Sequence, residues 1–196
     1  MSDLSQDALD QIFLKARTRN GWSDKPVPEK LLREIYEIAR MGPTTMNSQP
    51  QRIVFVTSAE GKKKLDLSLS EGNRAKTMKA PVVAIFAFDL HFYEHLAKTF
   101  PHFPGARDGF AGKEAATHEA AFRNASLQAA YFMIAARAKG LDCGPMSGFD
   151  QAKVNETFFP DGRWKANFIC ALGYGSDENL FPRGPRLGFE EACKVV

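Results

Sequence analysis

Four consecutive residues near the N-terminus carry side chains that could bind an anion: Arg17, Thr18, Arg19 and Asn20. Two guanidinium groups, a hydroxyl and an amide all donate hydrogen bonds, and guanidinium forks suit the geometry of phosphate oxygens. The run could therefore hold a phosphate group without a glycine-rich loop. Alternatively, it is only the cationic C-terminus of a helix, which the negative end of the helix dipole favours.

Two later loops have the chemistry to bind a flat heterocycle. The first lies between a predicted helix and a predicted strand, and its short polar side chains could hydrogen-bond to the edge of a ring: Thr44, Thr45, Asn47 and Gln49. The second runs from Gly144 to Gly148, where glycine backbone can approach a ligand closely and Pro145 stiffens the chain. Turns without any ligand would have much the same residue composition as these two loops. By composition alone, the three polar segments predict an anion or heterocycle site.

A metal-binding pattern offers a different interpretation of the chain. His91, Glu94 and His95 have the H-x-x-E-H spacing of inverted zinc peptidases, which places two imidazoles one helical turn apart. Such a site needs another ligand from a second helix, and this stretch is rich in proline and aromatic residues. We therefore predict that no metal is bound there.

Helices predicted from hydrophobic spacing must position these loops. The first runs from Leu4 to Ala16 with one face packed inward. The second begins at Pro28 and stops at Gly42-Pro43. Its inward side chains are predicted to be Leu31, Leu32, Ile35, Ile38 and Ala39. The others are a helix capped by Ser58 that carries solvated lysines at 62–64, a helix over 114–139, and a helix capped by Asp150 that ends near Pro160.

Three apolar segments are predicted to be strands, at 53–57, 81–88 and 166–173. The segment 81–88 is apolar at nearly every position, which predicts burial on both faces of a sheet. The segment 141–149 is expected to be a loop, and the second half of 89–112 an irregular excursion. Helices and strands alternate without a linker, which predicts a single domain over 1–196 with helices on both faces of one sheet.

The composition excludes several function classes. The chain has 196 residues with a net charge of +3 and no concentrated basic segment, so we predict no nucleic-acid partner. Its longest apolar run, 81–88, is too short to cross a membrane. The N-terminus is polar and acidic, and the three cysteines form no C-x-x-C pair. We therefore expect a cytoplasmic protein. The polar loops indicate that its partner is a small molecule.

The polar segments also resemble motifs of the FMN-dependent nitroreductase family, and the resemblance covers essentially the whole chain. Arg17-Thr18 is similar to the family's Arg-Arg-Ser phosphate motif, and the loop 43–50 is similar to its P-S-S-x-N-S-Q-P-W motif. The turn 145–150 resembles a P-x-E-G-F-D turn over the flavin. The chain departs from these motifs at Ala16, Asn20, Gln51 and Ser147.

The resemblance implies the residues that bind FMN. They are Arg17, Thr18, Arg19, Thr44, Thr45, Asn47, Asn73, Lys76, Asn124, Pro145, Met146, Ser147, Gly148, Arg183 and Arg186. Within this set, Arg19 is expected to compensate for the charges missing at Ala16 and Asn20. Because flavin carries the difficult chemical step, we assign no catalytic residue.

Within the family, the likeness is to the malonic semialdehyde reductases of the Rut pyrimidine-degradation pathway. It rests on the segments 16–22, 71–73, 121–131, 140–150 and 185–193. This likeness implies an α+β fold with a mixed sheet flanked by helices, and a homodimer with FMN at the interface and exchanged terminal arms. It also implies reduction of malonic semialdehyde to 3-hydroxypropionate with NADPH or NADH, and Arg123 is a candidate to bind the substrate carboxylate.

Two other functions remain open from the sequence. A broad NAD(P)H nitroreductase or quinone reductase would use the same flavin with a different acceptor. A noncatalytic flavin-binding protein would hold FMN without turning over any acceptor.

Overall fold

A four-stranded antiparallel sheet lies at the centre of the computed structural model, which describes residues 2–196. The strand order is β2-β3-β5-β4, with the following bounds: β2 Gln51–Val56, β3 Val82–Asp89, β5 Trp164–Gly173 and β4 Asp142–Met146. All eight residues of β3 are buried, as the apolar run predicts. An isolated parallel bridge joins Thr18 to Cys143, so that the N-terminal segment runs beside β4.

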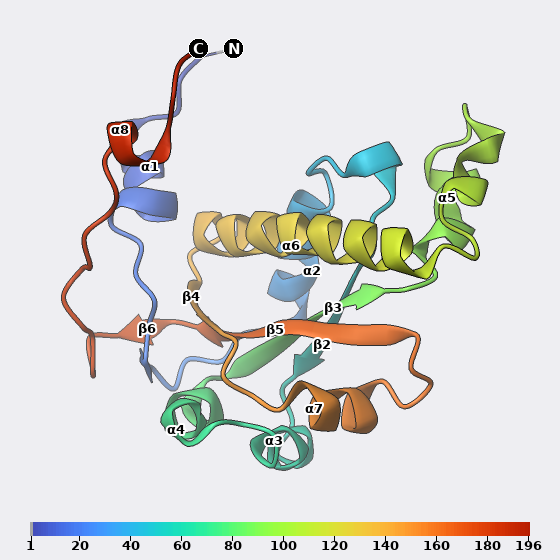
Figure 1. Ribbon diagram of the computed structural model, residues 1–196. Coiled ribbons are helices and arrows are strands. Elements are labelled where there is room, and N and C mark those ends of the chain that lie inside the picture. The colour runs from blue at the N-terminus through green and yellow to red at the C-terminus, as the bar shows by residue number, and fades with distance from the viewer. Residues whose placement is uncertain (1) are drawn as a thin grey trace.

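Helices cover both faces of this sheet, as Figure 1 shows. On one face lie α2 (Glu29–Ala39) and α6 (Glu114–Ala138), and on the other lie α3 (Ala59–Asp66), α4 (Glu71–Lys79) and α7 (Gln151–Phe158). A separate cluster of buried apolar side chains fills each side, one around Phe86 and Phe132 and the other around Ile85 and Ile169. The predicted α+β fold is confirmed.

The helix caps predicted from sequence are present. The Ser58 hydroxyl accepts a hydrogen bond from the Gly61 amide at 3.0 Å, and the Asp150 carboxylate accepts one from the Lys153 amide at 3.1 Å. That backbone hydrogen bond lowers the pKa of Asp150. Lys62 differs from the prediction of a solvated lysine: its ammonium donates to the carbonyls of Met78 and Ala80 at the end of α4, and burial lowers its pKa.

Several elements differ from the sequence predictions. The predicted loop 141–149 contains strand β4, because its backbone pairs with β5. The pairing forms even though Pro145 has no amide hydrogen to donate. Helix α4 was not predicted, and neither was the small sheet that pairs β1 (Gly21–Trp22) with β6 (Gly175–Ser176). Ile38 was predicted to point inward but is 49% exposed.

The terminal arms lie together, away from the sheet (Figure 1). The N-terminal arm holds α1 (Gln6–Leu9) and a π-helical turn, η1 (Asp10–Leu14), and the C-terminal arm holds α8 (Phe189–Ala192). Within this chain, the apolar face predicted for the first helix is covered only in part: Leu4 and Phe13 are exposed, whereas Leu9 and Ile12 are half-buried. Leu14 on this arm is exposed too. Phe189 on the C-terminal arm is exposed as well.

Four short helical elements complete the fold. They are η2 (Thr45–Asn47) in the predicted polar loop, and η3 (Phe92–His95), α5 (Leu96–Thr99) and η4 (Pro104–Gly109) in the predicted excursion. Among residues 2–196, no helix is long and apolar enough to cross a membrane.

Gly42 at the end of α2 has no room for a side chain. A Cβ atom there would lie 2.1 Å from Cδ2 of Tyr131, whose hydroxyl donates to the Pro43 carbonyl at 3.1 Å. We expect Gly42→Ala to lower the free energy of unfolding by about 1–3 kcal/mol, because the ring must move. Urea denaturation measures this loss. Gly72→Ala is the matched control, since its Cβ would meet nothing within 4 Å and alanine favours the helix; equal losses in both variants would contradict the packing argument.

Candidate functional site

The N-terminal and C-terminal segments cross where the phosphate-binding arginines are predicted. The Arg17 guanidinium donates to the Phe181 carbonyl, and the Arg183 guanidinium donates to the Ala16 carbonyl at 2.9 Å. Asn20 donates to the Asn179 carbonyl at 3.0 Å. Within residues 2–196, neither Arg17 nor Arg183 forms an ion pair, so both guanidinium groups keep donors for an external anion.

Arg19 is engaged in a different way. Its side chain is largely buried against Gly175, its Nε atom lies 3.5 Å from a carboxylate oxygen of Asp142, and its Nη1 atom donates to Asp177. These contacts tie the N-terminal segment to β4 and β6. The structure therefore places Arg19 in an internal ion-pair network, whereas the sequence suggested a compensating phosphate ligand.

Strand β4 links this cationic region to α4. Arg19 donates its amide to the Cys143 carbonyl at 3.3 Å at one end of the strand. Just beyond the other end, the Gly148 carbonyl accepts two hydrogen bonds, from the Ser70 amide at 3.1 Å and from the side chain of Asn73 at 2.9 Å. A Cβ atom on Gly148 would lie 2.5 Å from the Asn73 nitrogen. The turn thus needs a glycine to keep its contact with α4.

The remaining predicted residues of this region occupy the same strand and helix. Met146 is buried and its sulfur accepts from the Thr77 hydroxyl at 3.5 Å, whereas Ser147 is exposed. Lys76 lies on α4, and its carbonyl accepts a hydrogen bond from the Trp22 indole at 2.9 Å. Strand pairing and hydrogen bonds connect one group of predicted residues through β4. We call it the phosphate-side group: Arg17, Thr18, Asn73, Lys76, Pro145, Met146, Ser147, Gly148 and Arg183.

The second group lies in the loop 44–49 and on α6. The Thr45 amide donates to Oδ1 of Asn124 at 2.8 Å, and the Thr44 hydroxyl accepts from the Gln49 amide at 3.2 Å. Asn47 donates to the Thr99 carbonyl of α5 at 2.8 Å. This group is anchored to α6, whereas the Gly148 turn of the phosphate-side group contacts α4, which covers the opposite face of the sheet (Figure 1).

Besides Arg19, two predicted residues lie apart from both groups. The Arg123 side chain is 67% exposed and pairs with Glu119 one turn earlier on α6. Arg186 is exposed on the C-terminal arm, where its guanidinium donates to the carbonyls of Gly184 and Pro185. Sequence analysis missed Gln128, a buried polar residue four positions after Asn124 on the alanine-rich helix; that i, i+4 spacing was the available signal.

Of the histidines considered for a metal site, His95 ends η3 and His91 directly precedes it. His91 lies 3.9 Å from a carboxylate oxygen of Glu94. In the part of the chain that the structure describes, no group of three or more His, Cys, Asp or Glu side chains could hold a metal ion.

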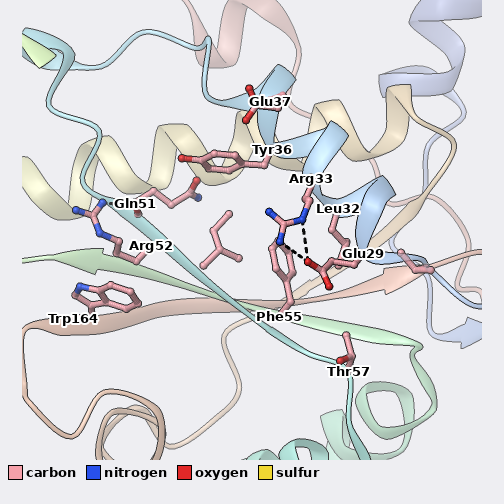
Figure 2. A pocket seen from close by; sticks show the side chains of 12 residues that line it. Glu29, Leu32, Arg33, Tyr36, Glu37, Gln51, Arg52, Phe55, Thr57 and Trp164 are labelled. Carbon is pink, nitrogen blue, oxygen red and sulfur yellow. Dashed lines mark hydrogen bonds and ion pairs between the residues drawn. The ribbon is translucent and has the colours of Figure 1, made fainter.

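A groove of about 1070 Å³ lies between α2 and the edge strand β2 (Figure 2). Leu32 and Phe55 contribute apolar surface to the groove. Two other lining residues form an ion pair, in which Nε of Arg33 donates to Oε1 of Glu29 at 2.9 Å. Sequence reasoning did not predict this groove. Its lining, within residues 2–196, includes none of the residues predicted to bind FMN.

Comparisons with known proteins agree with one another. Residues 17–174 match the family model described as the nitroreductase family. A protein of Ralstonia nicotianae with the provisional name NADH dehydrogenase/NAD(P)H nitroreductase is 54% identical over 196 residues, which cover 100% of both chains. A protein of Stenotrophomonas maltophilia with the same provisional name is 56% identical over 193 residues, covering 98% of each.

Two solved structures have the same fold. One is a provisionally named nitroreductase of Bacillus subtilis, with a TM-score of 0.87 and 23% identity, covering 98% of this chain and 100% of that one. The other is a provisionally named nitroreductase of Exiguobacterium sibiricum in complex with FMN, with a TM-score of 0.85 and 20% identity, covering 100% of both chains.

Proposed function

This chain belongs to the nitroreductase family, and we propose that it is an FMN-dependent oxidoreductase that takes hydride from NADPH or NADH. The observation that carries the proposal is the phosphate-side group, in which Arg17 hydrogen-bonds to the C-terminal segment and Arg183 hydrogen-bonds to the N-terminal segment. The FMN bound by the Exiguobacterium neighbour and the names of the relatives support it.

The donor set of the chain fits FMN. Arg17 and Arg183 suit a phosphate dianion, because guanidinium forks bind its oxygens in pairs. Asn73, Lys76 and the turn 145–148 would hold the flavin from one side, and the loop 44–47 would supply backbone and side-chain donors from another. When bound, FMN would supply hydride transfer between a nicotinamide and an acceptor, while the protein positions both and excludes water.

We further propose a homodimer with exchanged terminal arms, in which two chains complete each FMN site. Supporting this, the two groups of predicted residues lie on opposite faces of one chain, so that a second chain could unite them. The arms also expose Phe13, Leu14, Phe181 and Phe189, and large exposed apolar side chains that cluster on a protein mark association surfaces. Analytical ultracentrifugation that gave only a monomer would contradict this.

For the physiological acceptor we propose malonic semialdehyde, which would be reduced to 3-hydroxypropionate in pyrimidine degradation. The support is the sequence likeness alone. The names of the relatives favour a second candidate, a broad NAD(P)H nitroreductase or quinone reductase.

Rapid mixing of the reduced, FMN-loaded protein with each acceptor separates these functions. We expect malonic semialdehyde to reoxidise the protein faster than a nitroaromatic or a quinone does. If only the nitroaromatic or the quinone reoxidises the protein, malonic semialdehyde is not its acceptor. Reoxidation by none of them, with FMN bound, would indicate a noncatalytic flavin-binding protein.

Arg123 provides a specific test of the aldehyde. Its guanidinium is exposed on α6, where it could leave Glu119 for a substrate carboxylate. We expect Arg123→Ala to lower kcat/KM for malonic semialdehyde about tenfold, the value of one charge-assisted hydrogen bond, and to leave kcat/KM for propanal unchanged. An equal loss of kcat/KM for both aldehydes would show that Arg123 does not bind the substrate carboxylate.

A further inference from the structure

Two carboxamide side chains are buried on α6, a helix that otherwise presents mostly small apolar residues to the protein interior. Asn124 is 2% exposed and Gln128 is 6% exposed. They are four positions apart, so both project from the same side of the helix. A buried amide is costly unless its hydrogen bonds are made, so the partners of these two side chains indicate what they do.

Both side chains accept hydrogen bonds from backbone amides of one loop. Oδ1 of Asn124 accepts from the Thr45 amide at 2.8 Å, and Oε1 of Gln128 accepts from the Gln51 amide at 3.0 Å. Nδ2 of Asn124 donates to the Ala120 carbonyl at 2.8 Å. Adjacent turns of α6 therefore hold the two ends of the segment 45–51, which we call the held loop.

The held loop has a backbone that does not form easily by itself. Met46, Asn47 and Gln49 have φ angles of 51°, 48° and 44°, in the left-handed region that residues other than glycine rarely adopt. Such strain persists only where the surrounding structure imposes it. The two hydrogen bonds that the loop amides donate to α6 are partly buried, and they fix the loop at both of its ends.

We propose that Asn124 and Gln128 are positioning residues: they hold the loop in the conformation that binds FMN, and Asn124 acts through Thr45 without touching the flavin itself. This replaces the direct contact that the family resemblance implied for Asn124. The inference rests on the proposed function, because the held loop is a cofactor-binding element only if FMN binds.

Four variants test the proposal. Asn124→Leu and Gln128→Met keep the size of each side chain but remove the acceptor, whereas Gln128→Glu keeps an acceptor oxygen. Asn155→Leu is the matched control, since Asn155 accepts a hydrogen bond from the Ala166 amide at 2.8 Å on the other face of the sheet. FMN affinity is measured by flavin fluorescence, and amide hydrogen exchange at Thr45 and Gln51 is measured without FMN.

We expect Asn124→Leu and Gln128→Met each to weaken FMN binding about tenfold and to speed exchange at the amide that has lost its acceptor, because that donor is left unpaired. Gln128→Glu should bind FMN as the wild type does, and Asn155→Leu should not change FMN affinity. If Asn124→Leu weakens FMN binding with Thr45 still protected, Asn124 touches the flavin directly and the proposal is overturned. Unchanged FMN affinity in both apolar variants overturns it too.

Failure of the proposed function gives a different result. Wild-type protein would then not bind FMN, while exchange at Thr45 and Gln51 would still report whether α6 holds the loop. If Asn124→Leu does not fold, the comparison of Gln128→Met with Gln128→Glu decides the proposal.

Discussion

Replacing Asp89 with asparagine is expected to lower the free energy of unfolding by about 3 kcal/mol, which is typical of breaking a buried ion pair. Asp89 ends β3 and is 1% exposed. Its carboxylate accepts from Arg52 at 2.6 Å, from Arg163 at 2.9 and 3.1 Å, and from the His91 amide at 2.8 Å. Asparagine removes the charge that Arg52 and Arg163 share, and only Arg163 keeps a carboxylate partner, Glu94 at 3.1 Å.

The pH dependence of this loss has a definite sign. Burial alone would raise the pKa of Asp89, but hydrogen bonds from Arg163 and His91 and the charge of Arg52 outweigh it and lower the pKa. The carboxylate therefore stabilises the fold fully above its unfolded pKa of about 3.9, and this contribution disappears as the pH falls through the folded pKa. The stability difference between wild type and Asp89→Asn should shrink below about pH 4.

Urea denaturation from neutral to acidic pH measures both effects. Glu60→Gln is the control, because Glu60 pairs with Lys64 on the exposed surface of α3, where solvent screens the pair and it contributes little to stability. A loss in Asp89→Asn as small as that of the control, or one that does not change with pH, would show that the network is not a stabilising ion pair.

Arg17→Ala is expected to produce the largest change in cofactor binding. The Arg17 guanidinium lies beside the C-terminal arm and has no carboxylate partner within residues 2–196, so a phosphate would be its charged partner. Loss of charge-assisted hydrogen bonds worth about 1.5–3 kcal/mol predicts FMN binding weaker by about 10- to 150-fold. The affinity for riboflavin, which has no phosphate, should stay nearly constant.

Fluorescence titration with both flavins checks this prediction. Arg40→Ala provides the control, since Arg40 forms an exposed pair with Glu37 on α2 and should change neither affinity. If Arg17→Ala weakens riboflavin as much as FMN, Arg17 supports the fold of the segment and does not bind the phosphate.

The elements that could be predicted from sequence are those whose stability is local. The alanine-rich helix α6 and the apolar strand β3 follow from composition and length alone, and Ser58 and Asp150 mark helix starts through their own side chains. Strand β4 was missed because glycine and proline weaken the local preference for a strand, while pairing with a distant segment, β5, decides its conformation.

The site was predictable in its parts, but its arrangement was not. The sequence shows the donor side chains of Arg17 and Thr45 and the missing side chain of Gly148. The partners that give them their roles lie far away: the contact between Thr45 and Asn124 spans 79 positions, and the one between Arg17 and Phe181 spans 164. Charge alone also could not separate Arg17 from Arg19, because only the structure shows that Arg19 pairs with Asp142 and Asp177.

One measurement tests the proposed function most directly: the anaerobic absorbance spectrum of the FMN-reconstituted protein before and after addition of NADPH or NADH. We expect FMN to bind and one of the two nucleotides to bleach its visible absorption band. A protein that binds no FMN, or one whose bound FMN stays oxidised with both nucleotides, would contradict it.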